Sequence, residues 1–116
     1  MKNNRVYISL PIGEEREFME KQRAFSWEVV KELAMCGYKG VNPFNNGLSR
    51  ESNRLEHLKQ DFKMLLECDR ILLCPGYEES DGCQKELAIA VWSGIEVMKY
   101  EELSKNKATK GKNTTE

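Results

Sequence analysis

Stretches with two different hydrophobic periods alternate along most of this chain. A short β-branched and aromatic run at 5–10 predicts a strand, which the Pro-Ile-Gly at 11–13 ends. From residue 14 the apolar positions recur at intervals of three and four, as on one face of a helix. That face contains Phe18, Phe25, Val29, Leu33 and Cys36. Gly37 follows it and is placed to end the helix in the left-handed conformation.

The next unit repeats this order with a shorter strand. Residues 38–41 predict a brief second strand, which the Asn-Pro at 42–43 ends. The polar, glycine-containing stretch 44–52 predicts a loop, and a helix is expected over about 53–67. Its apolar stripe, which we expect to be buried, consists of Leu55, Leu58, Phe62, Leu65 and Leu66.

The third unit contains the most apolar strand. Residues 70–74 show no polar alternation after the first position, which is typical of a central parallel strand covered on both faces. Asp81 with Gln84 resembles a capping box, so a third helix is predicted over 82–93. A fourth strand is predicted at 95–98. The side chains that the third helix should bury are Cys83, Leu87, Ala90 and Val91.

The order of these elements, strand and helix three times and then a last strand, predicts an α/β fold. Helices would cover both faces of an open parallel sheet, giving three layers joined by right-handed crossovers. We expect four or five strands in a Rossmann-like or flavodoxin-like arrangement with the order 2-1-3-4. One domain is expected at 1–103, because 40% apolar residues in a 116-residue chain suffice for one core. The lysine-rich, polar stretch 104–116 is expected to be a disordered tail.

The composition narrows the classes of partner. A net charge of −1 gives no electrostatic reason to expect a nucleic acid polymer or an anionic membrane, and the apolar runs are too short to span a bilayer. The four cysteines form no Cys-x-x-Cys pair and the chain has one histidine, so a Cys/His metal site is not expected. We expect no cofactor either. Cysteines in apolar stretches suit a reducing cytoplasm, where we expect the protein to be located.

A ligand crevice is expected beyond the carboxyl ends of the strands, where the strand order reverses between the first and third strands. The residues that should border it are Ser9, Leu10, Pro11, Ile12, Gly13, Gly76, Ser80, Gly82 and Cys83, with Asn42 and Pro43 nearby. The chain has no G-x-G-x-x-G, P-loop or G-x-S-x-G motif. Backbone amides at the start of the third helix, with Ser80, form a candidate phosphate site.

The candidate chemistry near this crevice centres on carboxylates. Glu86 flanks the buried face of the third helix near its positively charged start, so it is the strongest candidate, with a plain surface charge as the alternative. Asp61 lies beside the stripe of the second helix and is a weaker candidate. Asp69 precedes the third strand, so it should lie at the opposite end of the sheet as a turn or cap residue. Tyr7 is expected to be half-buried near the crevice, and His57, one turn before Asp61, to be exposed.

Five segments, taken in order, resemble the nucleoside 2-deoxyribosyltransferase superfamily, and within it a small bacterial and phage branch. They are VYISLPI at 6–12, GVNPF at 40–44, the residues 61–69, ILLCPGYEES at 71–80 and GCQKELAIA at 82–90. The chain is also similar to deoxynucleoside 5′-monophosphate N-glycosidases, because Ser80 stands six residues before Glu86, as their phosphate-binding serine does. The resemblance extends to about residue 103 and implies the same α/β fold.

The resemblance implies a reaction at the N-glycosidic bond of a nucleoside or its 5′-monophosphate, without a cofactor. Glu86 would attack the anomeric carbon and form a glycosyl-enzyme, as in a retaining glycosidase. Asp61 would act near the leaving base as an acid or orienting group, and Tyr7 would position Glu86. Ser80 would bind the 5′-phosphate. The resemblance also implies a homodimer or a larger homo-oligomer.

Two departures from the family pattern leave a second function open. Leu10 stands where the family has glycine, so a narrower floor of the crevice is expected. Pro11 stands where the hydrolase branch has a further phosphate-binding serine. The alternative is therefore a non-catalytic binder of a nucleotide or a nucleotide-derived signal in the same crevice. A module that serves only assembly is a third interpretation, so the sequence leaves open whether the protein is an enzyme.

Overall fold

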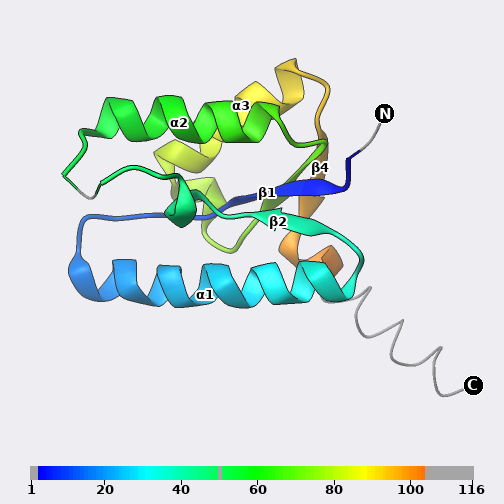
Figure 1. Cartoon of the computed structure of the whole chain (residues 1–116), viewed down its shortest axis with the longest axis horizontal. Helices are drawn as coiled ribbons and strands as arrows, with labels where there is room; N and C mark the ends of the chain where they lie inside the picture. The colour runs from blue at the N-terminus through cyan, green and yellow to red at the C-terminus, as the bar shows by residue number, and fades with distance from the viewer. Residues whose placement is uncertain (1–2, 50, 104–116) are drawn as a thin grey trace, which may run out of the picture.

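The structure is a computed structural model that describes residues 3–49 and 51–103, so the expected tail at 104–116 lies outside the described residues. The elements are β1 (Arg5–Ser9), α1 (Arg16–Met35), β2 (Lys39–Val41), η1 (Pro43–Asn45), α2 (Arg54–Leu66), β3 (Arg70–Leu73), η2 (Tyr77–Glu79), α3 (Asp81–Trp92) and β4 (Glu96–Lys99) (Figure 1). Each predicted strand and helix is present, and its ends differ from the prediction by one or two residues at most. The predicted loops contain the short 3-10 helices η1 and η2.

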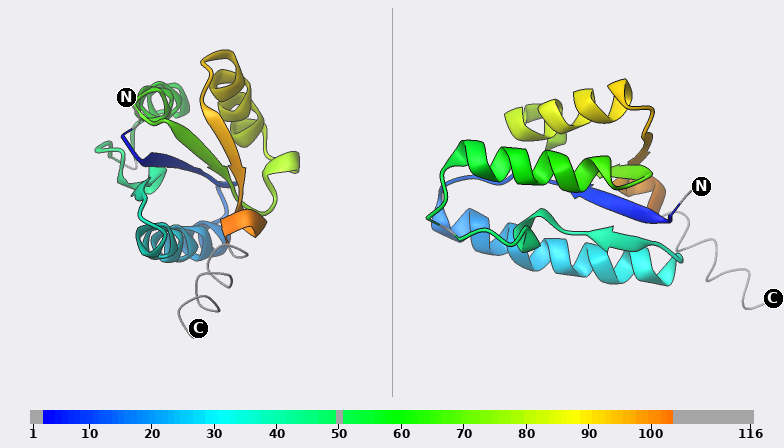
Figure 2. Two further views of the ribbon diagram at one scale, coloured as in Figure 1. Left: turned by 90° about the vertical axis from the view of Figure 1, so that its right-hand side faces the viewer. Right: turned by 45° about the horizontal axis from the view of Figure 1, so that its top comes forward.

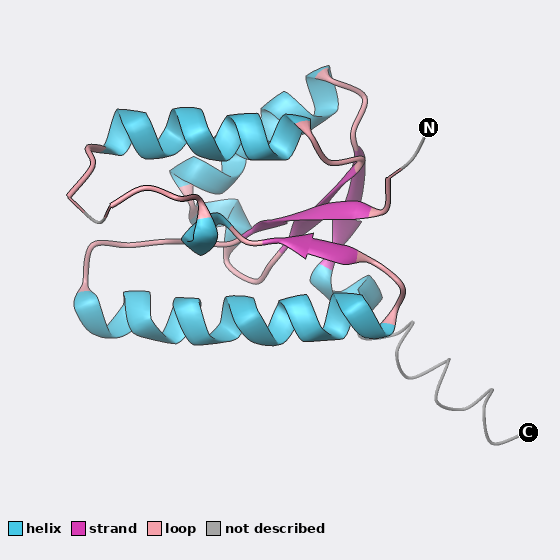
Figure 3. Cartoon of the chain, in the orientation of Figure 1, coloured by secondary structure: helices cyan, strands magenta, loops and turns pink. Residues whose placement is uncertain are grey.

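The four strands form one parallel sheet in the order β2-β1-β3-β4, which confirms the predicted topology (Figure 3). Helix α1 covers one face of the sheet, and α2 and α3 cover the other, so the three predicted layers are present (Figure 2). The two central strands β1 and β3 are neighbours in the sheet but not in the chain. The strand order therefore reverses between them, at the position where the crevice is expected.

Strand β1 divides the core through the alternation of its side chains. Val6 and Ile8 pack in the cluster that α1 covers, together with Leu10 just beyond the strand. Tyr7 packs in the cluster on the opposite face, and Ser9 follows it on that face by the two-residue period of a strand. All five side chains are less than 5% exposed. The hydroxyls of Tyr7 and Ser9 therefore need partners in the layer of α2 and α3.

Three side chains that the helical period predicts to be buried are exposed instead. Leu55 is 59% exposed, Leu66 is 56% exposed and Val91 is 62% exposed, whereas Leu65 of the same stripe is fully buried. The period locates an apolar stripe on a helix, but the sheet beneath decides how much of the stripe is covered. Leu55 lies in the first turn of α2, which begins beyond the strands (Figure 1). Leu66 and Val91 each follow a fully buried residue and therefore point about 100° away from the sheet.

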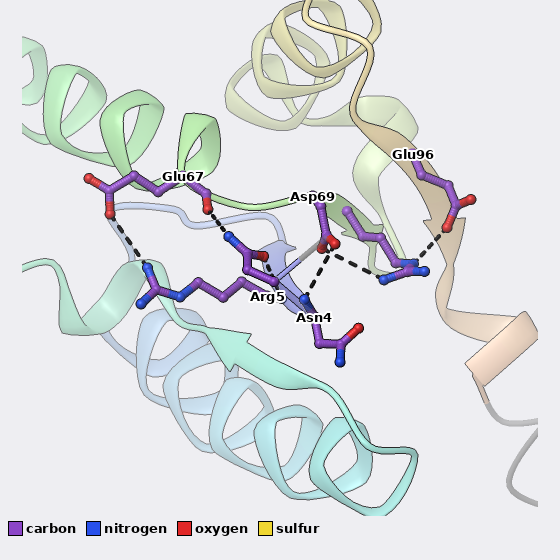
Figure 4. A network of polar contacts seen from close by, with 7 residues as sticks. Asn4, Arg5, Glu67, Asp69 and Glu96 are labelled. Atoms are coloured by element: carbon purple, nitrogen blue, oxygen red, sulfur yellow. Dashed lines mark hydrogen bonds and ion pairs between the residues drawn. The ribbon is translucent and has the colours of Figure 1, made fainter. Parts of the chain in front are cut away.

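Polar contacts tie together the amino ends of three strands, at the end of the sheet opposite to the crevice (Figure 4). The backbone N–H of Asn4 donates to Oδ2 of Asp69 at 3.3 Å, and Oδ1 of Asp69 lies 3.6 Å from Nη1 of Arg70. Nε of Arg70 donates to Oε2 of Glu96 at 2.6 Å. Asp69 thus links the start of β1 to the starts of β3 and, through Arg70, β4, at the predicted end of the sheet but without capping a helix.

Candidate active site

The start of α3 is fixed by Ser80. Its Oγ accepts a hydrogen bond from the backbone N–H of Cys83 at 3.3 Å, so Ser80 is the N-cap and α3 begins at Asp81. The predicted capping box of Asp81 and Gln84 is therefore wrong by one residue. The loop after β3 delivers Ser80 to the carboxyl edge of the sheet, and the helix that it caps places Glu86 in its second turn, facing β1.

The carboxylate of Glu86 is held by two hydroxyl groups of β1. The Tyr7 hydroxyl donates to Oε2 at 2.6 Å, and the Ser9 hydroxyl donates to Oε1 at 2.7 Å. Tyr7 and Ser9 are two residues apart on one face of the strand, so each carboxylate oxygen receives its own donor. Glu86 is only 7% exposed, and the two hydrogen bonds satisfy the buried polar groups of all three residues.

Burial raises the pKa of Glu86 from 4.5 to about 7, and the negative charge of Asp61 acts in the same direction. The hydrogen bonds from Tyr7 and Ser9 favour the carboxylate, so they lower this pKa and offset part of the effect of burial. Burial and the charge of Glu86 raise the pKa of Tyr7 well above its ordinary value, so the phenol keeps its proton and remains a donor. Both forms of Glu86 are accessible near neutral pH, as expected of a catalytic carboxylate.

Asp61 of α2 borders the same crevice and is held by a residue from the loop after β2. Nδ2 of Asn46 donates to Oδ1 of Asp61 at 3.0 Å and lies 3.1 Å from Nδ1 of His57. Burial raises the pKa of Asp61, whereas the Asn46 hydrogen bond and the His57 ring lower it. The expectation that His57 is an exposed residue is wrong, because the ring is half-buried in this network.

Asn46 is a site residue that the sequence reasoning missed. It lies in the stretch 44–52, which was predicted only as a polar loop, and it is 9% exposed. The available signal was the position of this loop, which leaves the carboxyl end of β2 and therefore passes over the crevice.

The crevice beyond the carboxyl ends of the strands has a volume of about 1150 Å³, slightly above the range of about 300–1,000 Å³ that is usual for small-molecule pockets. Asp61, His57 and Glu86 line it together. The other predicted residues along its walls are Leu10, Pro11, Ile12, Gly13, Pro43, Gly76, Ser80, Gly82 and Cys83. The structure thus brings the predicted catalytic residues Glu86 and Asp61 together with most of the predicted binding residues, and Tyr7 reaches Glu86 from beneath the crevice.

Two predicted binding residues, Ser9 and Asn42, lie beneath the walls of the crevice. Ser9 is fully buried and donates to Glu86. Nδ2 of Asn42 donates to Oγ of Ser26 at 2.9 Å, and Oδ1 accepts from the backbone N–H of Phe44 at the start of η1. Both residues support the walls, and a direct contact with a ligand stays a prediction for each.

Gly76 allows the loops after β1 and β3 to lie close together at the floor of the crevice. Gly76 has φ of 89°, and a Cβ atom there would lie 3.1 Å from Cγ of Pro11. Leu10 is 4% exposed and packs in the core under α1. The narrowing expected from Leu10 therefore falls on the α1 side of the crevice, whereas Glu86 lies on the α3 side.

Cations and an aromatic ring line the mouth of the crevice, which the sequence reasoning also missed. The guanidinium of Arg23 lies over the ring of Phe44, 4.9 Å from its centroid. Arg54 at the start of α2 pairs with Asp81 at the start of α3 at 3.2 Å. All four residues border the crevice, where one cation is paired with a carboxylate and the other covers an aromatic ring.

The thiol that borders the crevice belongs to Cys83, which is 1% exposed. Burial raises its pKa, so the group is a neutral thiol and not a nucleophile.

Among residues 3–49 and 51–103 there is no cluster of three or more His, Cys, Asp or Glu side chains that could hold a metal ion. Within these ranges no helix combines the length and apolar character that crossing a membrane requires.

Two solved enzyme structures share this fold. The chain superposes on CMP N-glycosidase BcmB of Clostridium botulinum with a TM-score of 0.58 and 21% identity, over 82% of this chain and 69% of that one. It superposes on the 2-deoxyribosyltransferase of Leishmania mexicana with a TM-score of 0.63 and 18% identity, over 83% of this chain and 63% of that one. The chain thus spans about two thirds of the length of each enzyme.

The fold expected from the resemblance to the nucleoside 2-deoxyribosyltransferase superfamily is thereby confirmed. No curated protein sequence matches the chain significantly. A family model described as a domain of unknown function, DUF4406, matches residues 4–99, so this chain belongs to the DUF4406 family.

Proposed function

We propose that this protein binds a nucleoside or its 5′-monophosphate in the crevice and cleaves or transfers its N-glycosidic bond, with Glu86 as the nucleophile. The observation that carries this proposal is the buried Glu86 carboxylate, held by the hydroxyls of Tyr7 and Ser9 where the strand order reverses. The proposal is supported by the fold shared with a CMP N-glycosidase and a 2-deoxyribosyltransferase.

In the proposed reaction the ionised Glu86 attacks the anomeric carbon of the bound sugar. The bond from that carbon to the base nitrogen breaks, its electron pair stays on the base, and a glycosyl ester of Glu86 forms. Water, or a second base in a transfer reaction, then attacks the same carbon and releases the Glu86 carboxylate. Tyr7 and Ser9 hold the two carboxylate oxygens, so the attacking group is oriented before the substrate binds.

Asp61 would serve the leaving base. Its pKa is raised by burial, so a protonated fraction persists at higher pH than for an exposed aspartate. A protonated Asp61 can give its proton to the departing base, which then leaves as a neutral molecule. Two carboxyl groups with different roles in one crevice correspond to the general scheme of retaining glycoside cleavage.

The start of α3 would receive the 5′-phosphate. The Oγ of Ser80 accepts from the backbone N–H of Cys83, and its hydroxyl also contacts the Cys83 thiol, so a phosphate oxygen would take the hydroxyl hydrogen from that thiol. The helix N-terminus adds a partial positive charge, and Arg54 nearby offsets the negative charge of Asp81, with which it pairs at 3.2 Å. These groups support a 5′-monophosphate as the preferred form of the substrate.

The decisive assay is incubation with the common deoxynucleosides, their 5′-monophosphates and CMP, followed by chromatography for free base. Base release by the wild-type protein should fall by at least about a thousandfold in Glu86→Gln, because the amide cannot form the ester intermediate. The matched control is Glu78→Gln, which removes an exposed carboxylate from η2 and should leave the rate unchanged. Base release that is equal in wild type and Glu86→Gln would refute the nucleophile.

A binder without turnover is the second candidate, and Pro11 favours it. Pro11 offers no hydroxyl where the hydrolase branch has a phosphate-binding serine, so phosphate recognition rests on the α3 side alone. Thermal unfolding with the same compounds separates the two functions, because a ligand of the folded state raises the melting temperature. Stabilisation without any base release supports the binder, and no stabilisation by any compound contradicts both functions.

We further propose a homo-oligomer in the cytoplasm. Four large apolar side chains on α2 and α3 are at least half exposed: Leu55, Leu66, Val91 and Trp92. Such side chains on one layer suit a face that another copy covers. The cytoplasmic location is supported by the buried cysteines Cys68, Cys74 and Cys83, which are thiols and not disulfides, as a reducing compartment maintains.

A further inference from the structure

The side-chain amide of Asn46 has one orientation that satisfies all its neighbours. The backbone N–H of Leu48 can only donate, and it contacts Oδ1 of Asn46 at 3.0 Å. The oxygen of the amide is therefore on the Leu48 side, and the NH₂ group is on the other side. There it meets Oδ1 of Asp61 at 3.0 Å and Nδ1 of His57 at 3.1 Å. The Asp61 carboxylate accepts and the Asn46 NH₂ group donates, so this contact requires the same orientation of the Asn46 amide.

This orientation determines where His57 carries its proton. An NH₂ group has only hydrogens to offer, so Nδ1 of the ring must accept a hydrogen bond and cannot itself be protonated. In the neutral ring the proton then lies on Nε2. Turning the amide over would face its oxygen toward the Asp61 carboxylate and break the bond from Leu48. The buried position of Asn46, which is 9% exposed, makes such an unpaired arrangement unfavourable.

The spacing on α2 directs the ring and the carboxylate to the same place. His57 and Asp61 are four residues apart and therefore share one face of the helix, and both line the crevice. Glu86 and Ser80 border the crevice from the neighbouring helix α3 and its N-cap. Because His57 and Asp61 line the same crevice as Glu86 and Ser80, the base of a nucleotide with its anomeric carbon at Glu86 and its phosphate at Ser80 would have α2 within reach.

We propose that Asn46 is a positioning residue that holds His57 as the Nε2–H tautomer, so that the ring donates a hydrogen bond to an acceptor atom of the bound nucleobase. This inference rests on the proposed function, and it deepens it by naming the side chain that reads the base. The recognised feature is a keto oxygen or an unprotonated ring nitrogen, because Nε2–H is a donor only. Asp61 remains the group that exchanges a proton with the base.

The chain offers a direct test of the tautomer, because it contains a single histidine. Protein labelled with ¹⁵N-histidine is measured at pH 8 in long-range ¹H–¹⁵N spectra, which distinguish protonated from unprotonated ring nitrogens. Wild type should show an unprotonated Nδ1. In Asn46→Asp the new side chain can only accept, so Nδ1 should become protonated. The matched control Asn45→Asp, at the exposed neighbouring position, adds the same charge and should leave the spectrum as in wild type.

A protonated Nδ1 in wild type, or an unchanged Nδ1 in Asn46→Asp, would overturn the role of Asn46. If Asn46→Asp does not fold, Asn46→Ala replaces it. That variant removes the donor without adding charge, so the Nδ1 resonance should move toward its position in the urea-unfolded protein. No movement in Asn46→Ala would overturn the proposal in the same way. None of these spectra requires a ligand, so they are independent of the proposed function.

The contact with the base is tested by affinity for CMP, the four deoxynucleoside 5′-monophosphates and 2-deoxyribose 5-phosphate, which has no base. His57→Ala should weaken nucleotide binding about tenfold, the effect of one lost hydrogen bond, and leave the affinity for the sugar phosphate unchanged. His57→Gln keeps a donor and should recover part of the loss. Equal nucleotide affinity in wild type and His57→Ala overturns the base contact. Failure of every nucleotide to bind wild type overturns the proposed function and the base contact together, while the spectra still decide the role of Asn46.

Discussion

Replacing Glu86 by glutamine should raise the free energy of unfolding at pH 8 and leave it nearly unchanged near pH 4.5. In the folded protein the pKa of Glu86 is about 7, whereas its ordinary value is 4.5. Between these pH values the folded state holds a proton that the unfolded state has released. The stability that this group contributes is therefore complete below pH 4.5 and is lost as the pH rises through 7. Glutamine does not ionise, so it avoids this loss.

The size of the effect follows from the difference between the two pKa values, about 2.5 units. At 1.36 kcal/mol for each unit, wild type should lose about 3 kcal/mol at Glu86 by pH 8. The side chain is only 7% exposed, so solvent screens little of this energy. In the variant the amide can accept from one hydroxyl and donate to the other, because Tyr7 and Ser9 can each do both. The substitution itself should therefore cost no more than about 1 kcal/mol below pH 4.5.

Urea unfolding of both proteins between pH 5 and 8 measures this difference in free energy, and thermal unfolding at the same pH values measures it as a shift in melting temperature. The melting temperature of Glu86→Gln should exceed that of wild type by about 10 °C at pH 8, and the gap should close toward pH 5. The control is Glu78→Gln, whose difference from wild type should not depend on pH because that residue is exposed. A gap between Glu86→Gln and wild type that is the same at pH 5 and pH 8 would show that burial does not raise the pKa of Glu86, and the reasoning would be refuted.

Three further predictions follow from the same structure. The kcat/KM for base release should rise with pH through about 7 as Glu86 ionises, and Tyr7→Phe, which removes a hydrogen bond to the carboxylate, should move this rise to higher pH in rate profiles. Ser80→Ala should lower the free energy of unfolding in urea by about 1 kcal/mol through loss of the N-cap, and calorimetry should show weaker binding of a 5′-monophosphate but not of the nucleoside. The double variant Leu66→Glu, Val91→Glu should reduce the mass found by light scattering to that of one chain while the circular dichroism stays unchanged; an unchanged mass would contradict the proposed interface.

The sequence sufficed for the fold because each element carries its own local signal. The continuous apolar run of β3 identified a strand buried on both faces, and the three- and four-residue spacing of α1 gave a helix whose Val29 and Leu33 are fully buried. Gly37 ends that helix with φ of 85°, as its position indicated. The alternation of strands and helices then left few topologies for a parallel sheet, and the observed order is the predicted one.

The candidate site was predictable where strands and helix starts define it, and not where a loop does. Tyr7 and Glu86 occupy regular positions on β1 and α3, so their encounter follows from the register of the two elements. Asn46 reaches Asp61 through the turn after η1, whose path no hydrophobic period encodes. The partner of His57 is Asn46, which this turn supplies. Because the sequence does not reveal the path of the turn, it leads to the expectation that His57 is exposed.

The structure also changes the meaning of the two residues that depart from the family pattern. Leu10 follows Ile8 by two positions, so strand alternation sends its side chain into the core under α1, away from the Glu86 carboxylate. Leu10 borders the crevice from the α1 side, whereas Glu86, the proposed nucleophile, reaches it from the opposite layer of the molecule. Pro11 is the departure with a chemical consequence, because it takes a donor from the phosphate side while its ring closes against Gly76. In the proposed function, loss of one phosphate contact weakens binding but leaves Glu86 in place, so we expect a reacting site with modest phosphate affinity and not a holding site without chemistry.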